Sequence, residues 1–490
     1  MQANHWTDVF ISSRRWLATT AIIALSVVVA LGGGWFVALL GGPIALGAIL
    51  GLIVLVLILR RIEIGYAALI AVICLLPFAA LPVNFAFKPT FLDVVLIAVF
   101  GVWLLERATG KLPGFVSTPL TLPVLGFLAI ALATFIAGLG NAPPTQTVLR
   151  HFVEVILSIL LFFLITDTVR DQPRLNLVTR LLIWGGILAA AIAVFLYLLP
   201  DQTSMDLLSR LSVFNYPSGP SVLRYILDDP TQPQRATGTS VDPNGLGGLL
   251  ILTLTLAVPQ LFAKRPLLRR GWLIIGLGLM ALALLLSFSR GSFVGVGVAL
   301  VALGLARYRK LLVIIVVALA LVLILPQTQS YVTHFFDGLQ VLNDSAASDL
   351  STQMRVGEYS DALILIQRYP ILGVGFTGAP DIDIYLKAAS LYLMITSQMG
   401  LVGLAAFLIV MATLFGSAWR IRKLVPAQPD LEPIWWGFHT ALFAALVGGV
   451  FDHYYFNLDF HHMVTLFWLC LGLAAVSTRL IKEQARQTVQ

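Results

Sequence analysis

The stretch around which the chain is organised is RATGTSVDPNGLGGLL, residues 235–250, where a polar loop opens directly into an apolar helix. A second arginine, Arg290, lies in LLLSFSRGSF, residues 284–293, between two further apolar runs. Arginine stays protonated at any working pH, and its planar guanidinium can pair with two phosphate oxygens at once. Arg235 and Arg290 at the edge of a membrane therefore predict a site for an anionic, phosphorylated headgroup. The alternative is that both are interfacial residues whose side chains extend to lipid phosphates.

The composition predicts a polytopic membrane protein. Hydrophobic residues make up 59% of the 490 positions, charged residues only 11%, and the mean hydropathy is +0.92. Soluble chains carry charge at about 25% of positions, so this chain cannot cover a surface that faces water. The net charge of +7 comes from short basic clusters between apolar runs, which is a topology signal and excludes nucleic acid as the expected partner. Cys74 and Cys470 lie inside apolar runs and form no disulfide framework.

About 12–14 apolar runs are long enough to cross the hydrocarbon core. The first run follows Arg14 and Arg15 and is succeeded at once by a second run, so we interpret it as an uncleaved signal anchor. The predicted spans cover residues 17–33, 36–59, 65–81, 91–106, 118–138, 148–166, 177–199, 243–262, 271–287, 292–306, 310–326, 390–418, 434–451 and 463–480.

The basic residues predict the orientation of these spans. Every second loop and the two tails hold 22 of the 31 Lys and Arg residues. Short basic loops stay in the cytoplasm, so the protein is expected in the cytoplasmic membrane with both termini cytoplasmic. The other nine then face outward: Lys88, Arg150, Arg210, Arg224, Arg235, Arg290, Arg355, Arg368 and Lys387.

Long polar segments divide the chain into four parts. Residues 1–118 are N-terminal transmembrane hairpins, and residues 119–326 are a central core with an outer loop at 201–242. Residues 327–389 form a large extracytoplasmic loop, and residues 390–490 are C-terminal hairpins with a cytoplasmic tail. Loops this long are uncommon as mere connectors, so both outward loops are expected to have a function.

The large outer loop contains TQMRVGEYSDALILIQRYP, residues 352–370. An apolar face and a charged face alternate with helical spacing, which predicts an amphipathic helix that lies on the outer surface and ends at Pro370. The apolar face consists of Val356, Tyr359, Ala362, Leu363 and Ile366. The glycines that follow predict a flexible turn. GVGFTG is a weak phosphate-loop signal, because it follows no strand and faces away from cytoplasmic nucleotides, so an ATP site is excluded.

Four motifs together resemble the O-antigen ligase and polymerase-like family of bacterial membrane glycosyltransferases. The resemblance covers about residues 120–475. It implies an all-α polytopic transmembrane helical bundle with a helical outer loop over the site. It also implies transfer of a glycan from a polyprenyl-diphosphate carrier to a sugar or lipid acceptor at the outer membrane face, without nucleotide, metal or other cofactor. The motifs are RATG…DPNGL (235–246), SFSRG (287–291), RVGEY…YPILGVG (355–375) and YL…QMGLVG (392–403).

This chemistry needs groups that bind the diphosphate and a base. Arginines stabilise the charge that develops on the departing lipid diphosphate, and we expect Arg235, Arg290 and Arg355 in this role. The base must take a proton from the acceptor hydroxyl. Asn244, after Pro243 at a helix start, is expected to cap that helix or to position the donor.

The sequence departs from the family where the base is expected. The family carries a His-Asn pair just before the equivalent of Tyr392, but Ala389 and Ser390 occupy those positions here. Either another residue is the base, or the chain is a divergent or inactive member. His461 or His462 is the expected base, because neutral imidazole suits proton abstraction near pH 7, and Asp383 is the competing choice. Further outward candidates are Asp381, Asp452 and His453.

Three alternatives remain open at this point. Asp452, His453, Asp459, His461 and His462 have the ligand types of a zinc site but no recognised spacing. A lipid-linked oligosaccharide flippase or a transporter would have a similar number of spans, although transporters usually show internal repeats, and none is visible here. A non-catalytic member of the family is the third alternative, favoured by the missing His-Asn pair.

Overall fold

The computed structural model describes residues 60–81, 88–226, 229–324, 350–377 and 388–489, together with a few isolated positions before residue 59. The chain divides into two compact units, Met1–Ile64 and Gly65–Gln490. The predicted spans 17–33 and 36–59 therefore fall almost entirely outside the described residues.

The described part of the chain is helical. Its strands are β1 (Arg224–Tyr225) and β2 (Gln234–Arg235), which pair antiparallel. Within these residues seven helices are long and apolar enough to cross a membrane. The prediction of an all-α polytopic membrane protein is confirmed.

Most helix bounds agree with the predicted spans to within five residues, but α3 ends six residues before the end of the predicted span 65–81, and α17 extends nine residues beyond the end of 463–480. Asp171 and Asp242 cap α7 and α9 with their carboxylates, and Thr90 and Asp93 form a capping box at α4. The helices are α3 (Ile62–Leu75), α4 (Phe91–Ala108), α5 (Thr121–Gly138), α6 (Gln146–Thr168), α7 (Gln172–Leu198), α9 (Pro243–Ala257), α10 (Arg270–Ser287), α11 (Arg290–Ala306), α12 (Arg309–Ile324), α15 (Leu391–Ile421), α16 (Glu432–Gly448) and α17 (His461–Val489).

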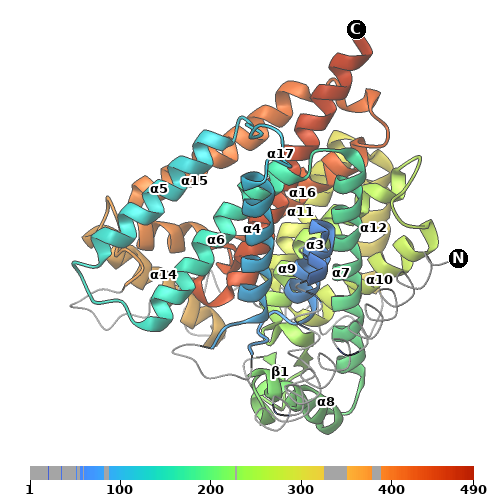
Figure 1. Ribbon diagram of the computed structural model, residues 1–490. Helices are drawn as coiled ribbons and strands as arrows, with labels where there is room; N and C mark the ends of the chain where they lie inside the picture. The colour runs from blue at the N-terminus through green and yellow to red at the C-terminus, as the bar shows by residue number, and fades with distance from the viewer. Residues whose placement is uncertain are drawn as a thin grey trace, which may run out of the picture. The chain divides into compact units, whose positions relative to one another are not determined.

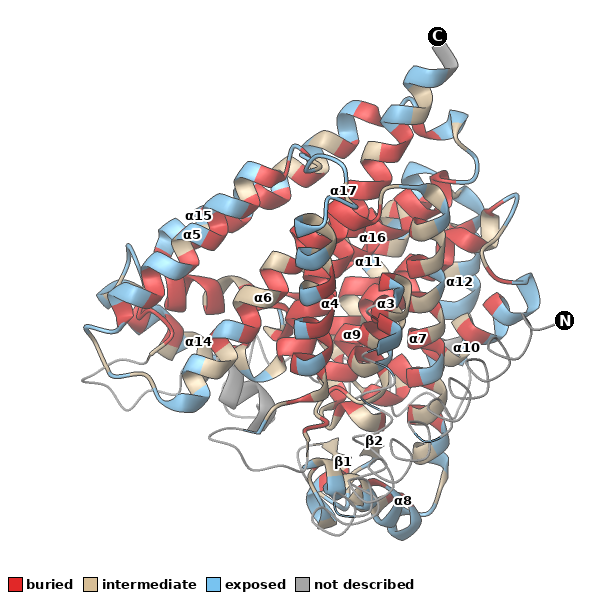
Figure 2. Ribbon diagram, in the orientation of Figure 1, coloured by how far each residue is buried: buried red, intermediate tan, exposed pale blue. Residues whose placement is uncertain are grey.

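Helices α9 and α17 form the centre of the larger unit. In the most apolar stretch of the span that contains α17, 94% of the residues are buried, and the share is 89% for the span that contains α9. The share is 33% in both α5 and α10. Helix α17 packs against α6 and α16, and α9 packs against α16 and α7. Figure 2 shows the buried residues concentrated along these helices, with exposed positions on α5 and α12. The exposed apolar faces are those expected of helices that meet lipid.

The outer loop at 201–242 is folded. It contains α8 (Asp201–Ser209), the short 3-10 helices η1 (Arg210–Phe214), η2 (Gly219–Val222) and η4 (Gly238–Ser240), and the β1–β2 pair. A small apolar cluster of Leu208, Val222 and Leu223 holds it together. The loop leads from α7 to α9, as Figure 1 shows.

The amphipathic helix of the large outer loop is present as α14 (Leu350–Arg368), but its buried face differs from the predicted one. Ala362 and Leu365 are 3% and 1% exposed, whereas Val356 and Leu363 are 61% and 51% exposed. Helix α14 packs against α15, and this contact selects which residues face inward. Val356 and Leu363 lie off the face that packs against α15, because spacing alone does not show which neighbour a helix will have.

The glycine turn (residues 371–377) is closely packed, contrary to the prediction of a flexible turn. Gly375 has a φ of +74°, and a Cβ built there would lie 2.3 Å from the carbonyl oxygen of Thr134 in α5. The Thr377 hydroxyl donates to the carbonyl of Gly138 at 2.7 Å. The glycines therefore allow the turn to approach the α5 backbone.

Helix α15 is interrupted at Gly400, where φ is 68° and ψ is −174°. The glycine turn fills the break. The Leu401 amide donates to Pro370 O at 2.8 Å, and the Gly375 amide donates to Gln398 O at 2.9 Å. Backbone groups inside a membrane need protein partners, and these bonds supply them where the helix cannot.

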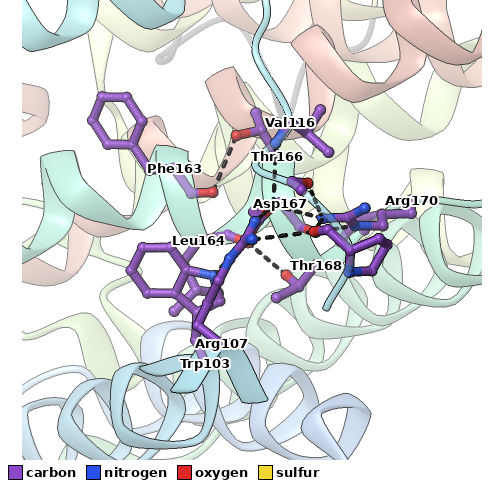
Figure 3. A network of polar contacts seen from close by, with 12 residues as sticks. Trp103, Arg107, Val116, Phe163, Leu164, Thr166, Asp167, Thr168 and Arg170 are labelled. Atoms are coloured by element: carbon purple, nitrogen blue, oxygen red, sulfur yellow. Dashed lines mark hydrogen bonds and ion pairs between the residues drawn. The ribbon is translucent and has the colours of Figure 1, made fainter. Parts of the chain in front are cut away.

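A buried carboxylate holds α4 to α6. Asp167 is fully buried and accepts from Trp103 Nε1 at 2.8 Å, from Arg107 Nε at 2.8 Å and from Arg170 Nη2 at 2.9 Å. The Val116 amide donates to the same group at 3.3 Å. Figure 3 shows the two guanidinium groups converging on this carboxylate. These contacts satisfy a charge that would otherwise be costly to bury.

Candidate functional site

Arg235 joins the two motifs that the sequence analysis selected. Its Nε donates to the carbonyl of Ser287 at 2.9 Å, and its Nη2 donates to Asn244 Oδ1 at 2.6 Å. The Ala236 amide also donates to Leu286 O at 2.8 Å. The end of α10 and the start of α9 are thus connected through Arg235, although the two motifs lie far apart in the sequence.

Helix α9 is capped by Asp242, not by Asn244. The Asp242 carboxylate accepts from the amides of Asn244 and Gly245 at 2.8 and 2.9 Å. The Asn244 side chain bonds Arg235 instead. Of the two roles expected for Asn244, capping was wrong, because Asp242 precedes Pro243 and occupies the N-cap position.

The backbone is strained in both motifs. Val241 has a φ of 60° and Phe288 has a φ of 52°. A left-handed conformation costs a non-glycine residue roughly 1–3 kcal/mol, and it persists only where the surroundings enforce it. Strain of this kind concentrates at functional sites, and here it occurs directly before Asp242 and within SFSRG.

The last loop (residues 449–460), between α16 and α17, lies against the start of α9. The Tyr454 hydroxyl donates to Asp242 Oδ1 at 2.9 Å, and the Tyr455 hydroxyl donates to Gly248 O at 2.8 Å. Burial, and then the nearby carboxylates of Asp242 and Asp452, hold the pKa of the Tyr454 hydroxyl well above its usual range. Tyr454 therefore remains a hydrogen-bond donor at any working pH.

The same loop receives the start of α15. The Leu391 amide donates to Gly449 O at 2.7 Å and to Asp452 O at 2.8 Å. Ala389 and Ser390, which replace the His-Asn pair, are each 5% exposed beneath this contact. The Tyr359 hydroxyl of α14 donates to Ala389 O at 3.2 Å, so α14 joins the same assembly.

Arg290 is the first residue of α11 and is half-buried. Its neighbour Gly291 approaches the last loop, since a Cβ at Gly291 would lie 2.9 Å from Phe451 Cβ. Arg355 belongs to α14, but its side chain is outside the described residues. Asp383 lies wholly outside them. The described part of the predicted diphosphate site thus comprises Arg235 and Arg290.

His461 and His462 are buried at the start of α17. They are 3% and 1% exposed. The ring of Phe460 lies beside His462, with 6.0 Å between ring centroids, and beside Tyr454, with 4.6 Å between centroids. The expected base residues are thus enclosed at the start of α17.

A buried carboxylate that sequence reasoning did not select lies beside His461. Glu154 Oε2 is 3.3 Å from His461 Nδ1, and Arg150 Nε donates to Glu154 Oε1 at 2.9 Å. Both side chains of the Glu154–His461 pair are less than 5% exposed. The signal was available, because an ionisable residue inside an apolar run is a functional candidate by default.

The alternative of a zinc site finds no assembled ligands in the described ranges. Among those residues, no group of three or more His, Cys, Asp or Glu side chains is placed to hold a metal ion. His453 and His462 each lie beside the Phe460 ring, and His461 and His462 are buried.

The apolar helices define a polytopic membrane protein, in which polar contacts join Arg235 to α9 and α10, and the last loop to α9 and α15. A profile of the family described as O-Antigen ligase matches residues 275–408, which include SFSRG, α14 and the start of α15. The resemblance to the O-antigen ligase and polymerase-like family is confirmed, and it supports a general role in surface polysaccharide assembly. No curated protein matches the chain.

Proposed function

We propose that the protein transfers a glycan from a polyprenyl-diphosphate carrier to a sugar or lipid acceptor on the outer side of the cytoplasmic membrane. The observation that carries this proposal is the connection of two arginine-bearing motifs through the bonds of Arg235 to Ser287 and Asn244. The family match includes the second of these motifs.

The proposed diphosphate site combines two kinds of positive potential. Arg235 and Arg290 supply full charges, and the start of α11 supplies the partial positive charge of a helix N-terminus. As the bond between the sugar and the diphosphate breaks, negative charge grows on the departing oxygen. Fixed cations stabilise that charge without having to reorganise during the reaction.

The reaction requires one proton transfer. The acceptor hydroxyl loses its proton to a base, and its oxygen attacks the anomeric carbon while the lipid diphosphate departs with the bonding electrons. A single direct displacement inverts the configuration at the anomeric carbon. From the sequence, the base is expected at His461, His462 or Asp383.

The arginines provide the test of the proposal. Arg290→Ala should lower transfer by about 100- to 1,000-fold, since one donor to a developing charge is worth that much. Arg290→Lys should also be poor, because an ammonium group cannot form the bidentate contact. Arg235→Ala and Arg235→Lys should behave in the same way. The measurement is the transfer of radiolabelled glycan from carrier lipid extracted from the source membranes to endogenous acceptor, using purified protein.

Arg210→Ala is the matched control, because Arg210 is an exposed arginine of the outer loop at 201–242. It should transfer at the wild-type rate. Arg235 also bonds protein groups, so each variant must be compared at equal amounts of folded, membrane-inserted protein. Near-normal transfer by both lysine variants would make these residues ordinary interfacial anchors and would contradict the proposed diphosphate site.

A lipid-linked oligosaccharide flippase is the second candidate. The break of α15 at Gly400 favours it, because interrupted helices are common at the binding sites of transporters. Purified protein in sealed vesicles would distinguish the two functions. A flippase moves a fluorescent carrier lipid across the bilayer without forming product, whereas the proposed transferase releases polyprenyl diphosphate and forms a new glycosidic bond.

A further inference from the structure

Three helices begin at the last loop (residues 449–460) or directly against it. Helix α9 meets it through Tyr454 and Asp242, and α15 meets it through the Leu391 amide. Helix α11 meets it where Gly291 approaches Phe451. The segment of the loop from 449 to 454 is therefore next to the residues proposed to hold the diphosphate.

Asp452 and His453 lie within this segment. His453 Nδ1 is 3.5 Å from Asp452 Oδ1, and the His453 amide donates to the same oxygen at 2.9 Å. The imidazole stacks on the Tyr454 ring, with 5.1 Å between centroids and an angle of 21° between planes, and its edge meets Phe460 at 6.3 Å. The two ring contacts hold the imidazole, and its Nδ1 lies near a carboxylate oxygen.

The orientation of the ring determines what it can do. A carboxylate facing Nδ1 favours the tautomer that carries its proton on Nδ1, which leaves a lone pair on Nε2. In general-base catalysis by histidine, a carboxylate that accepts a hydrogen bond from Nδ1 has this role. The tautomer is assigned from the contact with Asp452.

Accessibility separates His453 from His461 and His462. The side chains of His453 and Asp452 are 13% and 18% exposed, whereas His461 is 4% exposed and its neighbour Glu154 is 3% exposed. A base must reach the acceptor hydroxyl within hydrogen-bond distance. A partly exposed ring beside the start of α15 meets that requirement better than the enclosed rings of His461 and His462.

We propose that His453 is the general base of the transfer and that Asp452 is its positioning residue. This inference rests on the proposed function. Nε2 of His453 takes the proton of the acceptor hydroxyl as the oxygen attacks the anomeric carbon. The bond from that carbon to the diphosphate oxygen breaks at the same time, and the electron pair leaves with the lipid diphosphate. The imidazolium that forms is stabilised by Asp452 and later returns its proton to water.

The experiment measures transfer and donor binding separately. His453→Ala should lower kcat by at least about 100-fold, the usual contribution of a general base. Binding of a fluorescent polyprenyl diphosphate should be little changed. Added imidazole should restore part of the activity, because it can occupy the vacated space and accept the proton. Asp452→Asn should lower kcat with KM retained, and Asp452→Glu should recover part of the loss.

His151→Ala is the matched control. His151 also lies beside a carboxylate, with 3.7 Å from its Nδ1 to Asp459 Oδ1, and its side chain is 16% exposed. It should transfer at the wild-type rate and should not respond to imidazole. A general disturbance by the loss of a histidine from a His–Asp pair would instead affect both variants.

The outcomes separate this inference from the proposed function. If the wild-type protein transfers glycan and His453→Ala is fully active, the assignment of the base is overturned and the transferase proposal stands. Loss of activity in His453→Ala without imidazole rescue, together with loss of carrier binding, also overturns it. Loss confined to His461→Ala or His462→Ala assigns the base to that residue instead. Absence of transfer by the wild-type protein, with carrier lipid crossing the bilayer, overturns both proposals.

Discussion

The carboxylate of Asp167 shows how a single charge can be retained in an apolar protein. It is fully buried, but two arginines, an indole N–H and a backbone amide donate to it. Its partners come from α4, from the turn between α6 and α7, and from the segment that joins α4 to α5. Removing one member of such a network lowers the stability of the fold by more than the network contributes to it, because the remaining buried charges lose their partner.

Asp167→Asn should therefore destabilise the protein. The side chain keeps its shape but loses its charge, and Arg107 and Arg170 lose their shared counter-ion. We expect the free energy of unfolding to fall by about 3 kcal/mol, the lower end for a buried pair, since both arginines reach water. Thermal unfolding of the detergent-solubilised protein measures the loss. Transfer per folded molecule should be unchanged.

Asp171→Asn is the control for this substitution. Asp171 caps α7 by accepting from the Arg174 amide at 2.8 Å, and its side chain is 52% exposed. Asparagine caps helices as well as aspartate does, so stability should barely change. Equal destabilisation by the two variants would show that Asp167 has no special role.

Among the helices, α15 depends on one residue for its shape. Its break at Gly400 lets the glycine turn supply hydrogen bonds to the freed backbone. A Cβ at Gly400 would lie 2.0 Å from the carbonyl oxygen of Ile371. The break also separates the start of α15, which contacts the last loop, from the rest of the helix.

Gly400→Ala should destabilise the protein by about 3 kcal/mol, because alanine is strained at a φ of +68° and its methyl group has no space. Gly416→Ala, on the same helix, should be neutral or stabilising by up to about 1 kcal/mol. Nothing lies within 4 Å of a Cβ at Gly416. Thermal unfolding should give shifts of opposite sign, and shifts in the same direction would contradict this account of the break.

The membrane orientation is a property of the assembled protein, and it can be tested directly. Helix α14 should face outward and the segment between α15 and α16 should face the cytoplasm. Ser360→Cys and Ala427→Cys place thiols at exposed positions of these two segments. A membrane-impermeant reagent applied to intact cells should label Ser360→Cys. It should reach Ala427→Cys only after the cells are permeabilised.

The native cysteines will not obscure this measurement. Cys74 and Cys470 are both buried, so they should react slowly in the wild-type protein, which is the control. Labelling of Ala427→Cys but not of Ser360→Cys on intact cells would reverse the predicted orientation. Arg235 and Arg290 would then face the cytoplasm, where the proposed site could not meet an outward carrier glycan.

The positions of the described membrane helices could be predicted from the sequence with little error. The run predicted at 271–287 is α10 (Arg270–Ser287), and the run predicted at 177–199 is α7 (Gln172–Leu198). The reason is that a spanning helix must satisfy all of its backbone groups internally and must be apolar over a fixed length. Both requirements are local, so the residues of the helix are enough to reveal it.

The two arginines could also be selected from the sequence, because a permanent charge at the end of an apolar run is conspicuous. The contacts that connect their surroundings could not be predicted from the sequence. Arg235 bonds Ser287 across 52 positions, and Tyr454 bonds Asp242 across 212 positions. No pattern within a single segment contains such a contact.

The roles of the remaining residues were decided by packing. Val356 and Leu363 share an apolar stripe with Ala362, but contact with α15 left the first two exposed. The sequence offers both His453 and His461 as candidate bases. In the structure His453 lies beside Asp452, whereas His461 is enclosed beside Glu154. Burial and charge partners depend on which helices meet, and long-range packing sets them only once the chain has folded.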